Sequence, residues 1–117
     1  MKDLTASEAA VSRFHEQLDS ENYSAIYTQA DPKLREASRQ ADFTALMEAI
    51  HRKLGRVQTA TRRQFFVNYN LSGMQIRLTY QTKFSGGDAE EYFVWGKSGQ
   101  NLSLIGYHIN SAALIIK

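Results

Sequence analysis

The stretch from Met74 to Phe84 constrains the fold of this chain more than any other. Positions 74, 76, 78, 80 and 84 are apolar or aromatic, whereas every odd-numbered position between them is polar. A period of two sustained over this length predicts a β-strand with one buried face and one solvated face. Such a strand needs neighbours on both sides, so we expect a sheet in the C-terminal half of the chain.

Turn signals on both sides extend this strand into a meander. Asn70–Gly73 and Ser85–Asp88 are rich in the residues that tight turns favour. Residues 91–96 are apolar on both parities, which is typical of a central strand. Residues 102–109 form the last expected strand, and residues 111–117 are expected to extend it. Together these signals predict an antiparallel meander.

One more strand is expected to precede Met74. After Gly55 the periodicity changes from helical to two, and Val57, Thr59, Thr61, Phe65, Val67 and Tyr69 share one parity. These six residues are therefore predicted to lie on one face of the sheet. The sheet then has four strands.

The first half of the chain carries helical spacing with recognisable start and stop signals. Thr5–Glu8 fits a capping box that would open the first helix, and Asn22 is placed to cap the second. Asp31-Pro32 is expected to end that helix and begin a short third one. Asp42 is expected to cap the clearest helix, which Gly55 should end. That helix carries an apolar stripe of Phe43, Leu46, Met47, Ile50 and Leu54.

The order of these elements predicts the fold class. With 117 residues, we expect one α+β domain over 1–117, with helices in 5–55 and an antiparallel sheet in 56–117. The helices are expected to pack on one face of a curved four-stranded sheet. The face of the sheet that they cover would then line the interior of a cone.

Three segments carry a resemblance to a known family: Phe14–Tyr23, Arg52–Gly55 and Leu104–Ser111. They resemble small bacterial proteins of unknown function with a nuclear-transport-factor-two-like, or cystatin-like, cone fold. The resemblance implies a secreted, periplasmic or lipid-anchored envelope protein, whose leader and any lipid anchor would have been removed. It also implies a superfamily that contains isomerases, dehydratases and non-enzymatic binding or homodimerisation modules.

Composition excludes several kinds of chemistry. The chain has no cysteine, so it forms no disulfide and has no thiol nucleophile. A net charge of +2 does not favour a nucleic-acid partner, and no apolar run reaches the length of a transmembrane helix. The N-terminal residues show no leader pattern, so the alternatives are a cytoplasmic protein or one whose leader has been removed.

Histidines are the first candidates for chemistry, and their spacing does not predict a metal site. His15 lies four residues before Asp19 on the first helix, which predicts a solvated helix pair. His51 is expected to be a cation in the last turn of its helix. His108 is the one weak catalytic candidate, because a histidine on the inner face of a cone can act as a general base. Tyr107 must then face the other way.

Aromatic residues with polar atoms are the candidates for a ligand pocket. We expect a pocket for a small apolar ligand among Tyr23, Tyr27, Tyr69, Tyr80, Trp95 and His108. No metal or cofactor is expected. The leading expectation is a non-enzymatic envelope module that binds a small apolar ligand or a protein partner through the concave face of the sheet, or that forms a homodimer. The alternative is an isomerase or dehydratase with His108 as the base.

Overall fold

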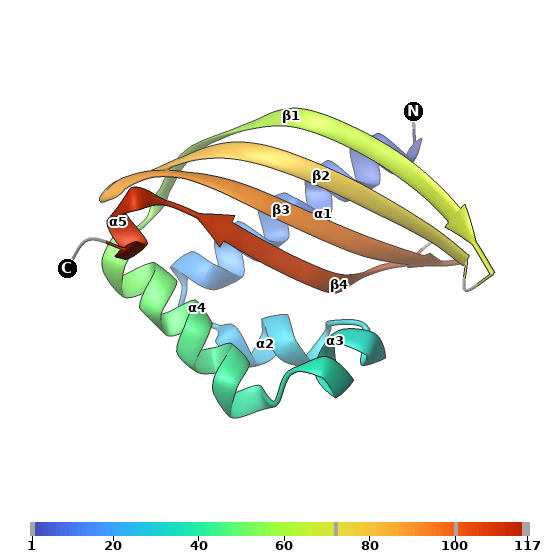
Figure 1. The fold of residues 1–117 in the computed structure, drawn as a ribbon, viewed down its shortest axis with the longest axis horizontal. Helices are drawn as coiled ribbons and strands as arrows, with labels where there is room; N and C mark the ends of the chain where they lie inside the picture. Colours follow the sequence, from blue (N-terminus) through green and yellow to red (C-terminus); the bar gives the residue numbers. More distant parts are fainter. Residues whose placement is uncertain (1, 72, 100, 116–117) are drawn as a thin grey trace.

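A computed structural model describes residues 2–71, 73–99 and 101–115, and it has the expected α+β architecture (Figure 1). The helices and strands are, in chain order, α1 (Lys2–Asp19), α2 (Tyr23–Thr28), α3 (Pro32–Ala37), α4 (Gln40–Leu54), β1 (Val57–Asn70), β2 (Gly73–Phe84), β3 (Gly87–Ser98), β4 (Asn101–Asn110) and α5 (Ala112–Ile115). The four strands form one antiparallel sheet in the order β1-β2-β3-β4. The predicted fold class is therefore confirmed.

The sheet is strongly curved, and α1 runs along its concave side (Figure 1). Helices α2 and α3 lie on the β4 side of the sheet, and α4 runs from there to the start of β1 (Figure 1). Since α3 contacts β4 and α1 contacts both β1 and β4, the helices close the concave side. This arrangement is compatible with a nuclear-transport-factor-two-like cone. None of the described helices is long and apolar enough to cross a membrane.

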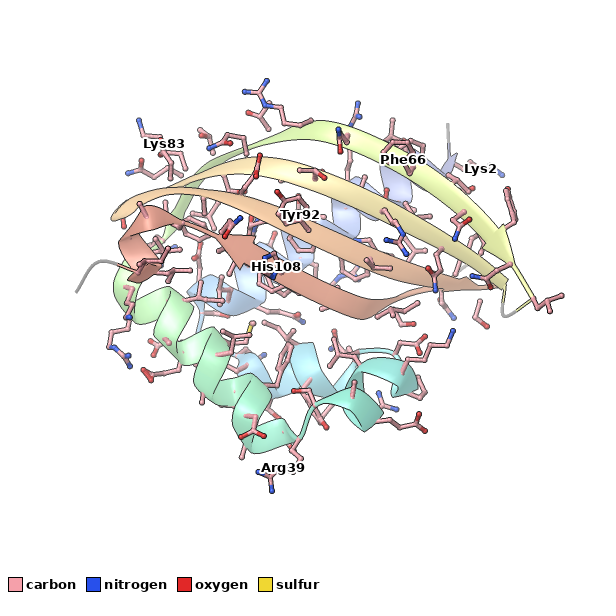
Figure 2. The ribbon with its side chains drawn as sticks, viewed as in Figure 1. Lys2, Arg39, Phe66, Lys83, Tyr92 and His108 are labelled. Carbon is pink, nitrogen blue, oxygen red and sulfur yellow. The ribbon has the colours of Figure 1, made fainter. Side chains whose placement is uncertain are left out.

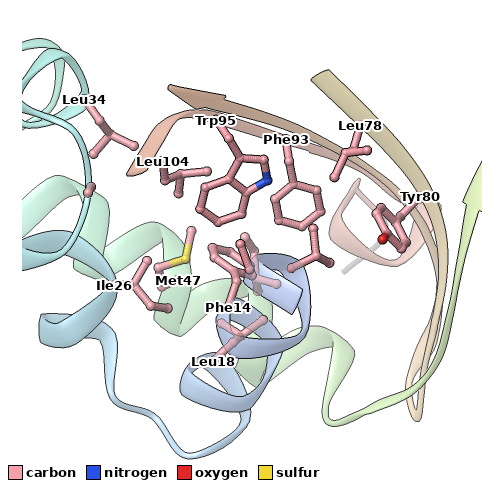
Figure 3. Close-up of a cluster of buried hydrophobic side chains, with 14 of the residues drawn as sticks. Phe14, Leu18, Ile26, Leu34, Met47, Leu78, Tyr80, Phe93, Trp95 and Leu104 are labelled. Atoms are coloured by element: carbon pink, nitrogen blue, oxygen red, sulfur yellow. The ribbon is translucent and has the colours of Figure 1, made fainter. Parts of the chain in front are cut away.

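The core fills the space between α1 and the concave face of the sheet (Figure 3). Phe14 packs edge-on against Phe93 with ring centroids 5.2 Å apart, and the Trp95 ring lies parallel to that of Phe93 with centroids 6.1 Å apart. The alternation predicted for β2 is confirmed by the burial of Ile76, Leu78, Tyr80, Thr82 and Phe84. The concave face is therefore occupied by packed side chains over most of its area.

Strand β1 changes face partway along its length, which the sequence pattern did not predict. The register shifts between Arg62 and Gln64, as in a β-bulge. A second shift lies between Val57, which pairs with Phe84, and Thr59. Between the two shifts even-numbered residues share the concave face, as the pairing of Arg62 with Tyr80 shows. After the bulge, Phe65 and Val67 pair with Leu78 and Ile76. The expected face is therefore right for Val57, Phe65, Val67 and Tyr69. It is wrong for Thr59 and Thr61, which pair with Lys83 and Gln81.

Several local signals operate as predicted. Asp31 is the N-cap of α3, and its carboxylate accepts from the Lys33 amide at 3.0 Å. Gly55 ends α4 with φ at 78°, in the region that favours glycine. Asn22 precedes α2, although its side chain makes no capping hydrogen bond.

Other local predictions are wrong. Helix α1 begins at Lys2, so the capping-box residues Thr5–Glu8 lie within the helix. Helix α4 begins at Gln40, and Asp42 in its first turn accepts from Arg39 Nε at 3.3 Å. Leu46 is 46% exposed and does not belong to the buried stripe. Residues 112–115 form α5 rather than an extension of β4, because the Leu114 amide bonds back to the Ser111 carbonyl. Residues 116–117 of that expected extension lie outside the described residues.

Candidate functional site

A carboxylate lies in the middle of the hydrophobic core. Glu91 belongs to β3 and has the same parity as Phe93 and Trp95, so it points to the concave side, where it is fully buried. Burying a carboxylate is costly unless hydrogen-bond donors surround it. The surroundings of Glu91 are therefore the first place to look for a site.

Three donors from three different elements converge on Glu91. His15 Nε2 on α1 lies 2.7 Å from Oε1, and Thr82 Oγ1 on β2 donates to the same oxygen at 2.5 Å. The Tyr107 hydroxyl on β4 donates to Oε2 at 2.5 Å. We call these four residues the Glu91 cluster. Hydrogen bonds to an ionised carboxylate are stronger than those to a neutral acceptor.

Aromatic rings enclose the cluster. The His15 ring lies edge-on to Phe93 and Phe84, with centroids 6.0 and 6.4 Å away. The Tyr107 ring lies 4.7 Å from that of Phe14. Burial, followed by the charge of Glu91 and its hydrogen bond, raises the pKa of the Tyr107 hydroxyl well above its usual value. That hydroxyl therefore remains a donor throughout the physiological pH range.

Most of the cluster is buried. His15 is 6% exposed and Thr82 and Glu91 are fully buried, whereas Tyr107 is half-buried. None of the four members lines any of the cavities described below. The arrangement holds protons in a low-dielectric interior and joins α1 to three strands, but it offers no space beside the carboxylate for a substrate.

A small cleft opens between α1, α2 and β4. Its volume is ≈ 60 Å³, with Phe14, Ile26 and Trp95 among its apolar walls. Arg13, Gln17 and Gln29 supply its polar groups, and Gln17 Nε2 donates to Gln29 Oε1 at 3.1 Å. Pockets that hold small-molecule ligands usually measure about 300–1,000 Å³. The cleft is therefore large enough for a few water molecules or one inserted side chain.

Three further hollows lie at the surface. One of ≈ 170 Å³ is lined mainly by polar residues near the β1–β2 and β3–β4 hairpin ends, and includes Asp31, Lys33 and Lys97. One of ≈ 430 Å³ is open beside α5. One of ≈ 410 Å³ lies beside the first turn of α1, where Lys97 Nζ contacts Asp3 Oδ1 at 2.6 Å. Among the described residues, no group of three or more acidic or histidine side chains is placed to hold a metal ion.

The structure does not bring the predicted pocket residues together. Of Tyr23, Tyr27, Tyr69, Tyr80, Trp95 and His108, only Trp95 lines the cleft. Its Nε1 is buried with no partner among the described residues, as is the Tyr23 hydroxyl. The Tyr27 hydroxyl donates to the carbonyls of Arg35 and Ser38. Tyr80 is a core residue, and Tyr69 is 75% exposed at the end of β1.

His108 lies on the convex face of the sheet, where it is exposed. Its ring is 5.7 Å from that of Tyr92 on the neighbouring strand, and the two side chains are labelled in Figure 2. The prediction that Tyr107 and His108 face opposite ways is correct, but Tyr107 is the one that points inward. His108 is therefore not placed to act as a general base inside the cone.

The histidine in the interior is His15, for which we expected a solvated pair with Asp19. That expectation is wrong, since His15 contacts Glu91 and the Asp19 carboxylate accepts from the Val57 amide at 3.2 Å. The sequence did contain a signal for this. His15 lies four residues after Val11 and three before Leu18, within the buried stripe of α1. Likewise, Glu91 shares the parity of Phe93, and a buried carboxylate requires partners.

The two edges of the sheet differ in how they are covered. At β4, the Asp31 amide donates to the Leu104 carbonyl at 2.9 Å, and Ser103 Oγ donates to Asp31 Oδ2 at 2.8 Å. At β1, the Val57 amide donates to Asp19. Within the described part of the chain, no further backbone hydrogen bond outside the β1–β2 ladder involves residues 58–69.

Three of the five exposed large hydrophobic side chains among the described residues lie at or next to this edge. Phe66 is 60% exposed, Tyr69 75% and Leu71 fully exposed. Phe66 and Tyr69 belong to β1 and Leu71 follows it, and the side chain of Phe66 is labelled in Figure 2. Comparison with known proteins adds no assignment, because no family model and no curated protein matches this chain.

Proposed function

We propose that this chain is a non-enzymatic protein-interaction module that binds an extended segment of a protein partner along β1. The observation that carries the proposal is the open edge of β1, which is 14 residues long and exposed along most of its length. A strand edge of this kind presents unpaired N–H and C=O groups to any chain that adds to the sheet. It also lacks proline, which would interrupt such pairing.

The remaining surfaces support other functions less well. The concave face is covered by α1, and the cleft of ≈ 60 Å³ is smaller than the pockets that usually hold small-molecule ligands. The hollows of ≈ 430 and ≈ 410 Å³ have the volume of a ligand pocket, but neither is lined by His108 or by a member of the Glu91 cluster. An isomerase or dehydratase activity draws no support from His108, which is exposed on the convex face. The interior pair of His15 and Glu91 has the chemistry of a base and its carboxylate partner, but it borders none of the cavities described above.

A location in the envelope and membership of the cone-fold family are further parts of the proposal, and they rest on the resemblance of the three segments named above. Fractionation of cells that carry a tagged chromosomal copy, with its native upstream sequence, tests the location. Recovery in the cytoplasmic fraction would contradict it.

Titration with a short synthetic peptide that alternates threonine and valine tests the binding mode. We expect the amide resonances of residues 58–69 to shift in two-dimensional NMR, because an added strand forms hydrogen bonds to the free side of β1. The amides of β4 serve as the internal control, since Asp31 covers that edge at Leu104. The titration is carried out on monomeric protein. Shifts centred on Trp95 and the cleft would indicate a different site, and the absence of shifts would contradict edge binding.

A further inference from the structure

From the structure we infer that the partner which β1 fits best is a second copy of this chain, paired antiparallel through residues 64–70. This inference rests on the proposed use of the β1 edge for binding. We call residues 64–70, which read Gln-Phe-Phe-Val-Asn-Tyr-Asn, the edge segment. The resulting dimer would contain one continuous eight-stranded sheet.

The composition of the edge segment favours pairing with itself. It contains no charged residue, no proline and no glycine, and four of its seven residues are aromatic or β-branched. Neutral segments of this kind have a strong tendency to form strand pairs. The rest of β1 differs, because Arg62 and Arg63 lie at the bulge just before the segment. A neutral, aromatic strand on the partner is therefore a better match than a charged one.

The register follows from symmetry. We place the two-fold axis at Val67, so that Val67 of one copy faces Val67 of the other. The numbers of any two facing residues then add up to 134, and Phe65 faces Tyr69 while Phe66 faces Asn68. Both members of every pair have the same parity, so the outward N–H and C=O groups of one strand meet those of the other. Arg63 then lies opposite Leu71, and no two like charges face each other.

The side chains that this register joins are the ones left uncovered in the single chain. On the concave side, each Tyr69, 75% exposed, gains the Phe65 ring of the other copy. On the convex side, the two Phe66 rings become diagonal neighbours, which lie within reach of aromatic side chains. The side-chain contact between α1 and β1, from Glu8 to Arg62 Nε at 3.2 Å, lies outside the edge segment.

The interface is a modest one. A strand pair of seven residues with its aromatic side chains buries on the order of 1,000 Å² in total, at the lower limit for specific association. We therefore expect a dimer that forms in the micromolar range and dissociates on dilution.

Sedimentation velocity over protein concentrations from low micromolar to millimolar tests the inference. We expect the sedimentation coefficient of the wild-type chain to rise from that of a monomer to that of a dimer. The double substitution Phe66→Lys with Asn68→Lys should abolish this rise, because in the proposed register each lysine directly faces another. Both side chains are exposed, so the fold of the single chain should be unaffected.

Two matched variants make the test specific for the register. Phe66→Lys with Asn68→Glu places a lysine opposite a glutamate twice, and this variant should dimerise. Thr59→Lys with Thr61→Lys adds two charges to exposed positions of β1 outside the edge segment, and it should also dimerise.

The results separate this inference from the proposed function. A wild-type chain that stays monomeric at all concentrations, or whose dimer is unaffected by the double lysine substitution, would overturn the self-pairing. The proposed function would nevertheless stand if the threonine–valine peptide shifts the β1 amides of the monomer. It would fall together with the self-pairing only if that peptide produces no shifts either.

Discussion

Replacement of Glu91 by glutamine tests whether the buried cluster depends on an ionised carboxylate. Glutamine has the size and shape of glutamate, so the substitution leaves no cavity. Its amide oxygen can keep the bonds from His15 Nε2 and Thr82 Oγ1, which both reach Oε1 in the wild-type chain. Its amino group takes the position of Oε2, and the Tyr107 hydroxyl must change from donor to acceptor. All three contacts therefore persist as neutral hydrogen bonds.

The expected cost follows from this change of charge. Hydrogen bonds to charged groups contribute about 1.5–3 kcal/mol each and neutral ones about 0.5–1.5, so three weakened bonds lower the free energy of unfolding by about 3 kcal/mol. The neutral amide loses less hydration when buried, which offsets part of this loss. We expect a net decrease of about 2 kcal/mol. Since a domain of this size has a stability of about 5–15 kcal/mol, the variant should remain folded.

Urea unfolding followed by tryptophan fluorescence measures the effect. Trp95 is the only tryptophan and is 6% exposed, so its emission reports the loss of the core. Glu90→Gln is the matched control, because Glu90 is the neighbouring carboxylate and points to the convex side, where it accepts from the Tyr92 hydroxyl. We expect this control to stay within about 0.5 kcal/mol of the wild-type stability. Equal stabilities for the two glutamine variants would refute the role of charge in the cluster.

Two further predictions concern alkaline pH and the turn between β2 and β3. The Tyr107 pKa in the folded chain is raised well above 10, so the hydroxyl ionises first in the unfolded chain, and stability present below about pH 10 is lost as pH rises toward the folded-state pKa. The loss for this group is at most about 1.4 kcal/mol per pH unit. Tyr107→Phe should remove that contribution to the pH dependence of urea unfolding above about pH 10. Tyr80, whose pKa is raised to about 12, continues to contribute in the wild-type chain and in the variant. Identical pH dependence in the two proteins would contradict this assignment. At the turn, a methyl group on Gly86 would lie 2.9 Å from the Leu54 carbonyl oxygen, so Gly86→Ala should lower thermal stability by about 1–3 kcal/mol. Gly106→Ala is its control, with no neighbouring atom closer than 3.9 Å, and a similar effect of both substitutions would count against the close contact at Gly86.

Much of the architecture could be predicted because it depends on residues close together in the sequence. The alternation in Met74–Phe84 identified β2 and its buried face, since side chains of a strand alternate whatever the strand packs against. Gly55 ended α4, and Asp31 capped α3, because these signals act within one helical turn. The class of fold followed from the order of the elements, helices first and a strand meander second.

The site and the exposed edge depend on distances that only the folded chain defines. His15 and Glu91 are separated by 76 positions, and they meet because α1 lies across the concave face of the sheet. The alternation of side chains along a strand predicted that Tyr107 and His108 face opposite sides of the sheet. Which of the two points inward depends on the side of the sheet on which the helices pack. The difference between the two edges also depends on tertiary packing, because α3 docks on β4 and not on β1. Local periodicity specifies how a strand is built, whereas its neighbours in three dimensions determine which of its surfaces remain available.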